Sequence, residues 1–159
     1  MGAERGLIFL DRQFVAGEKI GLDTAPLIYY LNRQEPYFDV CLELLKRVES
    51  GKLRAVVSVV TEMELLATET VQADRRSIND VEQLLRRLDN LQVLDVDRTV
   101  ARRAATLRAH TRIKGLDALI VATAITQGCR CVIGNDAEVS RRVTELDYLT
   151  LDQILDSTR

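Results

Sequence analysis

Apolar and polar positions first form a clear pattern in residues 19–31, with the sequence KIGLDTAPLIYYL. An apolar run over residues 20–22 ends at Asp23, and the apolar residues after it recur at helical spacing. Pro26 falls in the first turn of that helix, where its missing N–H breaks no hydrogen bond. The pattern predicts a buried strand that leads directly into a helix, with Asp23 at the junction.

The same alternation continues along the chain. Further strands are predicted where short runs are rich in apolar and β-branched residues, at residues 55–60, 91–96, 129–133 and 148–151. Further helices are predicted at residues 37–48, from Thr61 onward, and at residues 78–88, 99–111, 116–126 and 137–146. Strands that alternate with helices predict the α/β class, here a three-layer α/β/α sandwich with a central, mostly parallel sheet of about five strands.

The first 18 residues show too little pattern for an assignment. The apolar run over residues 7–10 is compatible with a short strand or with an arm that binds a partner. We therefore treat residues 1–18 as an N-terminal extension of unassigned role and residues 19–159 as a single domain. A chain of 159 residues is long enough to bury a core without disulfides.

Composition narrows the function classes. A formal net charge of −2 gives no overall basic field, so any contact with nucleic acid must depend on local patches. The three cysteines, two of them in a C-R-C sequence, indicate reduced thiols packed as small apolar side chains, and with a single histidine they do not support a zinc site. No early apolar run resembles a signal peptide or a membrane span, so we expect a cytoplasmic protein without membrane contact.

Four carboxylates stand near predicted strand-to-helix junctions: Asp23, Glu64, Asp117 and Asp136. Each has an ordinary explanation, since Asp is a preferred N-cap and Glu64 follows Thr61 at the spacing of a capping box. Taken together they predict more, because the carboxyl ends of parallel strands meet at one edge of a sheet. That edge is where open α/β sheets bind their ligands.

Carboxylates gathered at one edge would repel one another. Two like charges about 4 Å apart cost roughly 4 kcal/mol at an effective dielectric near 20, whereas a helix amino end offsets only about 0.3–1 kcal/mol. A divalent cation would remove this deficit. Oxygen ligands without histidine or cysteine favour Mg²⁺ or Mn²⁺ over zinc.

Four segments of the chain carry a family resemblance: LDTAPLIYYL, SVVTEMELL, GLDALIVATAI and IGNDAEV. In this order and spacing they resemble the acidic motifs of the PIN-domain ribonucleases, and within that family the VapC-type toxins of VapBC toxin–antitoxin systems. The resemblance covers about residues 19–151 and implies Mg²⁺-dependent cleavage of RNA by a toxin that a small antitoxin protein neutralises. It assigns catalysis and metal binding to Asp23, Glu64, Asp117 and Asp136, with Glu138 as a further metal ligand. The motif's spacing favours Glu64 over its neighbour Glu62.

Other residues bear on substrate and partners. Arg108, Arg112 and Lys114 lie within a few turns of Asp117 and either hold the RNA backbone or form a solvated basic face. We expect a homodimer, in which the aromatic residues of the first two helices belong to the core or to the dimer surface.

The chain also departs from the family pattern at two positions. The family usually has Asn or Ser where this chain has Ala25, and Thr or Ser where it has Gly134. These losses support an alternative function, a catalytically weak or inactive PIN-like domain that acts as a binding or assembly module. A phosphoacceptor or phosphatase domain that uses Asp23 is disfavoured, because the sequence Asp23-Thr24-Ala25 lacks a second Asp.

Overall fold

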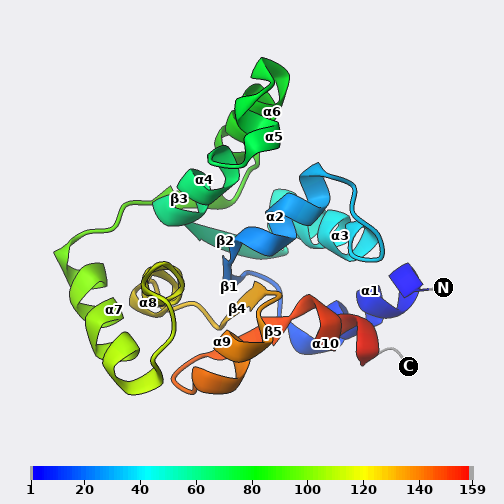
Figure 1. Ribbon diagram of the computed structural model, residues 1–159. Helices are drawn as coiled ribbons and strands as arrows, with labels where there is room; N and C mark the ends of the chain where they lie inside the picture. The colour runs from blue at the N-terminus through cyan, green and yellow to red at the C-terminus, as the bar shows by residue number, and fades with distance from the viewer. Residues whose placement is uncertain (1, 158–159) are drawn as a thin grey trace.

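Five parallel strands form one central sheet in the computed structural model, which describes residues 2–157 (Figure 1). The strands are β1 (Glu18–Leu22), β2 (Leu53–Ser58), β3 (Leu91–Leu94), β4 (Cys131–Gly134) and β5 (Asp147–Thr150). Their order across the sheet is β3-β2-β1-β4-β5, and every neighbouring pair is parallel. The predicted α/β class and parallel sheet are confirmed.

Helices cover both faces of this sheet. They are α1 (Gly2–Gln13), α2 (Thr24–Leu31), α3 (Phe38–Glu49), α4 (Val59–Leu66), α5 (Glu69–Gln72), α6 (Arg75–Arg87), α7 (Arg98–Thr111), α8 (Gly115–Thr126), α9 (Ala137–Arg142) and α10 (Leu151–Asp156). Figure 1 shows α7, α8 and α9 on one side of the sheet and α1, α2 and α3 on the other.

Successive strand residues contribute side chains alternately to two separate hydrophobic cores, one on each face of the sheet. Val57 of β2 packs in the core that includes residues of α1, α2, α3 and α10, while its neighbour Val56 packs in the core with α7, α8 and α9. In β4, Ile133 and Val132 divide in the same way. Side chains of successive strand residues point to opposite faces, so a sheet buried on both faces needs nearly continuous apolar runs. This explains why the strands read as unbroken runs in the sequence.

One strand ends earlier than its β-branched run predicted. The run over residues 55–60 was expected to be all strand, but β2 stops at Ser58, and Val59 and Val60 begin α4. The Ser58 hydroxyl accepts a hydrogen bond from the Val60 N–H at 3.1 Å, which caps the helix. A local cap therefore outweighs the strand preference of two valines.

Element boundaries also differ near the C-terminal end. Strand β4 begins at Cys131 instead of residue 129, and α9 ends at Arg142 instead of residue 146. Residue Leu151, expected in the last strand, begins α10, which the sequence pattern did not predict. Thr150 and Gln153 form a full capping box there, with the Gln153 N–H donating to Thr150 Oγ1 and the Thr150 N–H donating to Gln153 Oε1.

The N-terminal segment is helical, so the alternative of a short strand over residues 7–10 is wrong. Helix α1 packs against α3 and α10, and the Leu10 side chain is 1% exposed within the core. Asp11 also pairs with the buried Arg47 of α3 at 2.7 Å. Helix α1 therefore packs as part of the helical layer that contains α3 and α10.

The cysteines agree with the expectation from composition. Cys41, Cys129 and Cys131 are free and buried, as predicted for thiols packed in a core. Among residues 2–157, no helix combines the length and the apolarity needed to cross a membrane.

Candidate functional site

Asp23 and Asp136 lie at the carboxyl edge of the sheet, immediately beyond or near the ends of two neighbouring strands. The β1–β4 pairing continues past Leu22, because the Asp23 N–H donates to the Ile133 carbonyl at 2.9 Å. The chain runs from β1 to β2 on one side and returns through β4 on the other, so the connections diverge between β1 and β4. Ligands of open α/β sheets bind outside the carboxyl ends at such a point.

Both of these aspartates also cap helices. Asp23 Oδ1 accepts from the Thr24 N–H at 2.7 Å, and Asp136 Oδ1 accepts from the Glu138 and Val139 N–H groups at 2.9 and 3.0 Å. The capping role expected for each is confirmed. It occupies only one carboxylate oxygen of Asp136, so capping leaves the other oxygen available to a ligand.

Glu64 meets the same edge from α4. The Thr24 hydroxyl donates to Glu64 Oε1 at 2.7 Å and lies 3.3 Å from the Thr61 hydroxyl. The expected capping box between Thr61 and Glu64 is wrong, because Ser58 caps α4 and Thr61 is fully buried inside the helix. Glu64 is thus held by a side chain next to Asp23 and has no capping role.

Asp117 enters from the first turn of α8, where it is half-buried. Burial and, after it, the charges of Asp23, Asp136 and Glu64 raise its pKa to about 6, against the charge of Lys114, which lowers it. The pKa of Asp23 is also raised, first by burial and less by Glu64 and Asp136, against hydrogen bonds from Tyr148 and Thr24 that lower it. These mutual effects bring all four predicted carboxylates into one electrostatic field.

The donor chemistry of this group fits a hard divalent cation. Its members offer only carboxylate oxygens, and their repulsion is what a cation would relieve. Within residues 2–157, however, no three or more His, Cys, Asp or Glu side chains are arranged closely enough to hold a metal ion. The carboxylates are therefore neighbours at the sheet edge without forming a coordination shell in this arrangement.

The other predicted site residues are placed differently. Glu138 pairs with Arg142 on its own helix at 2.6 Å. Glu62 lines a shallow surface hollow with Val59 and Met63. Apart from the hydrogen bond from the Glu138 backbone N–H to Asp136 Oδ1, these contacts tie neither residue to the four carboxylates.

Of the three basic candidates, Lys114 is tied most directly to the site. It is exposed, precedes α8, and lowers the pKa of Asp117 by its charge. Arg108 is exposed in the last turn of α7. Arg112 takes a left-handed backbone conformation at the end of α7 (φ 59°), and its carbonyl accepts from Arg142 at 3.3 Å.

Tyr148 of β5 belongs to the site and was missed by the sequence analysis. Its hydroxyl donates to Asp23 Oδ2 at 2.5 Å, and the side chain is 4% exposed. Burial, together with the Asp23 charge and this hydrogen bond, raises the pKa of Tyr148. No local signal could have revealed it, because a tyrosine in a short apolar strand is ordinary core.

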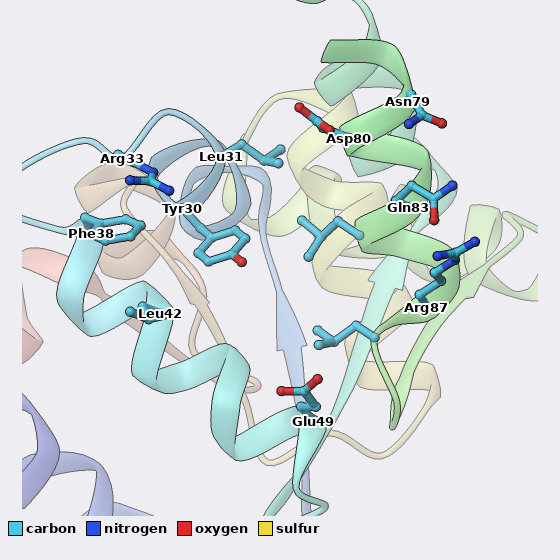
Figure 2. Close-up of a pocket in the computed structure, with 12 residues that line it drawn as sticks. Tyr30, Leu31, Arg33, Phe38, Leu42, Glu49, Asn79, Asp80, Gln83 and Arg87 are labelled. Carbon is cyan, nitrogen blue, oxygen red and sulfur yellow. The ribbon is translucent and has the colours of Figure 1, made fainter. Parts of the chain in front are cut away.

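A groove lies elsewhere, between α2 and α3 on one side and α6 on the other. Figure 2 shows Tyr30, Phe38 and Leu42 facing Asp80 and Gln83 across it. Its volume is about 1010 Å³, and none of the four carboxylates lines it. The groove is therefore a second surface feature, separate from the carboxylate edge in the residues that line it.

Comparison with solved structures identifies the same fold in known proteins. The chain matches DNA-bound VapBC of Salmonella typhimurium with a TM-score of 0.64 at 23% identity, over 84% of this chain and 98% of that one. It matches FitAcB of Neisseria gonorrhoeae (TM-score 0.63, 21% identity, 83% and 97% covered). It also matches VapBC2 of Rickettsia felis bound to a DNA fragment from its promoter (TM-score 0.60, 19% identity, 83% and 98% covered).

Comparison of the sequence with protein families also identifies a related family. No curated protein matches the chain. The PIN domain family matches residues 20–145, a segment that contains all four carboxylates and most of the chain. The resemblance predicted from the acidic motifs is confirmed: the chain belongs to the PIN domain family.

Proposed function

We propose that this chain is a metal-dependent endoribonuclease and the toxin of a toxin–antitoxin pair. PIN domains are generally nucleases, and the solved structures that share the fold include VapBC complexes. The observation that carries the proposal is the convergence of Asp23, Glu64, Asp117 and Asp136 at the carboxyl edge of the sheet, where their charges and burial raise the pKa of Asp117 to about 6. Perturbed carboxylates at a ligand-binding sheet edge are typical of catalytic sites.

Asp23, Asp117 and Asp136 would hold Mg²⁺ or Mn²⁺, with Glu64 acting directly or through water. A bound ion there supplies Lewis acidity for hydrolysis, in which water adds to phosphorus and the bond to the leaving oxygen breaks. The chain's own part is to fix the carboxylates: Thr24 holds Asp23 through its N–H and Glu64 through its hydroxyl. Lys114, Arg108 and Arg112 would contact the RNA backbone.

The test is thermal melting with and without Mg²⁺, combined with cleavage of a mixed RNA pool. Asp23→Asn and Asp136→Asn keep the helix caps, since Asn caps as well as Asp. We expect Mg²⁺ to raise the melting temperature of the unsubstituted protein and not that of either variant, and cleavage to be lost in both. Cleavage that persists in both variants would overturn the proposal.

A specific observation favours an alternative, a PIN domain that binds without cleaving. Ala25 and Gly134 remove two short polar side chains that could orient carboxylates or water. If the protein binds Mg²⁺ and cleaves no RNA in the pool, this alternative holds.

We further propose that the groove between α2, α3 and α6 receives a segment of the antitoxin. Its lining combines the apolar side chains Tyr30, Phe38 and Leu42 with charged residues at the rim, a composition typical of helix-binding grooves. Leu42→Arg should abolish co-purification of the proposed antitoxin with this chain. Met63→Arg, on an exposed position outside the groove, should not.

We also propose that the chain forms a homodimer, which size-exclusion chromatography with light scattering would test.

A further inference from the structure

Gly134 at the end of β4 leaves a space that no other residue type could leave. A Cβ at this position would lie 2.0 Å from Tyr148 Oη, 2.6 Å from Tyr148 Cζ and 2.8 Å from Asp23 Cβ. Real Cβ atoms do not approach other atoms this closely. The absence of a side chain at 134 is therefore a requirement of the arrangement around it.

That space is the route by which Tyr148 reaches Asp23. Tyr148 lies in β5, and β4 separates β5 from β1, at whose end Asp23 stands. The phenol passes over Gly134, and its hydroxyl donates to Asp23 Oδ2 at 2.5 Å. A side chain from an outer strand thus contacts the central carboxylate of the candidate site.

The two oxygens of Asp23 are held from different directions. Oδ1 accepts from the Thr24 N–H at 2.7 Å, and Oδ2 accepts from Tyr148. Two fixed donors leave a carboxylate little rotational freedom, while each oxygen keeps a lone pair for a ligand. A residue that acts in this way positions the carboxylate and does not itself touch the substrate.

We propose that Tyr148 is a positioning residue, which fixes the Asp23 carboxylate through the space left by Gly134 and supplies the hydroxyl that position 134 lacks. The proposal rests on the proposed function, in which Asp23 is a metal ligand. On this proposal, Gly134 does not weaken the site, because the Tyr148 hydroxyl from β5 takes the place of the missing polar group.

The test is Tyr148→Phe, which removes the hydroxyl and keeps the ring that packs over Gly134. The matched control is Tyr37→Phe, because Tyr37 also donates to an aspartate, Asp152 Oδ1 at 2.7 Å, but outside the four carboxylates. Outer partners of metal ligands typically change metal affinity about 10–100-fold when removed. We expect Tyr148→Phe to weaken Mn²⁺ binding at least about 10-fold by calorimetry, with Tyr37→Phe unchanged.

A second measurement separates this proposal from the proposed function. In crystals of metal-free Tyr148→Phe, Asp23 should change rotamer or occupy more than one, whereas Asp23 in Tyr37→Phe should keep its orientation. If the unsubstituted protein binds no metal, the proposed function fails, and the orientation of Asp23 still decides the positioning role. An unchanged Asp23 in Tyr148→Phe, or unchanged Mn²⁺ affinity, would overturn it.

Gly134→Ala tests the same geometry from the other partner. Its Cβ would displace the phenol, so it should weaken Mn²⁺ binding as Tyr148→Phe does. The two changes together should weaken binding by less than the sum of their separate losses, because both remove the Tyr148–Asp23 hydrogen bond, although Gly134→Ala also crowds Asp23 Cβ at 2.8 Å. Fully additive losses would contradict the proposed route over Gly134.

Discussion

At the scale of single residues, hydrogen bonds stabilise the charged form of the site carboxylates, whereas burial and neighbouring charges disfavour it. Asp23 gains hydrogen bonds from Thr24 and Tyr148, yet burial and two neighbouring carboxylates raise its pKa. The pKa of Asp117 is raised by burial and by the charges of all three other carboxylates, so it reflects their combined effect. Fixed hydrogen bonds hold the acids near one another at the cost of charge repulsion.

Asp117 should make stability depend on pH in a defined direction. Its pKa rises from 3.8 to about 6 on folding, so the folded state holds this proton more tightly than the unfolded state. The group's contribution is fully present below about pH 4 and is lost as pH rises to about 6, where the carboxylate ionises. In metal-free buffer, the stability of Asp117→Asn relative to the unsubstituted protein should therefore increase between pH 4 and pH 6.

Urea denaturation at several pH values would measure this difference. Asp97→Asn is the control, because Asp97 also lies at a helix start, capping α7, and is exposed away from the four carboxylates. The change that Asp97→Asn shows over the same pH range is the background with which Asp117→Asn is compared. A flat difference for Asp117→Asn would contradict the shared field.

At the scale of elements, periodicity predicted which segments are helices and strands, while local hydrogen bonds set where they end. The valines at 59 and 60 read as strand because β-branched residues favour it, and the Ser58 cap turned them into helix. Helix α10 was missed because its six residues are too few to show a period, although Thr150 and Gln153 carry the capping signal.

The same limit applies to the site. The gathering of Asp23, Glu64, Asp117 and Asp136 at one edge of the sheet could be predicted, because each stands near a junction that periodicity marks. Tyr148 could not, since its role depends on Gly134 and on β5 lying beside β4, which no local pattern encodes. Sequence spacing locates residues along the chain, and only strand order shows which of them meet.

Packing between α8 and β1 depends on one glycine. A Cβ at Gly21 would lie 2.8 Å from the Ala124 Cβ and 3.1 Å from Val132 Cγ2. Gly21→Ala should therefore cost about 1–3 kcal/mol of stability, the usual range for overpacking a core. Gly115→Ala is the control, because its Cβ would meet nothing within 4 Å. Equal midpoints of urea denaturation for both variants would refute the close approach.

At the scale of the whole molecule, strand order turns distant residues into neighbours. Asp23 and Asp136 are far apart in sequence, and they meet because β1 and β4 pair at the middle of the sheet. Glu64 and Asp117 arrive on two different helices, α4 and α8. A shared site built this way exists only in the assembled fold, so local unfolding of either helix should abolish it.

The N-terminal helix lies outside the segment that the PIN domain family matches, yet its packing indicates that it unfolds with the rest. Leu10 of α1 is buried in the core that also contains Leu44 of α3 and Ile154 of α10. Leu10→Ala should therefore lower the free energy of unfolding by about 2–5 kcal/mol, and denaturation should remain a single transition. Ile8→Ala on the same helix, 50% exposed, should change it little. Were α1 an independent appendage, Leu10→Ala would leave the main transition where it is, so the denaturation midpoint decides whether residues 2–13 belong to the folding unit.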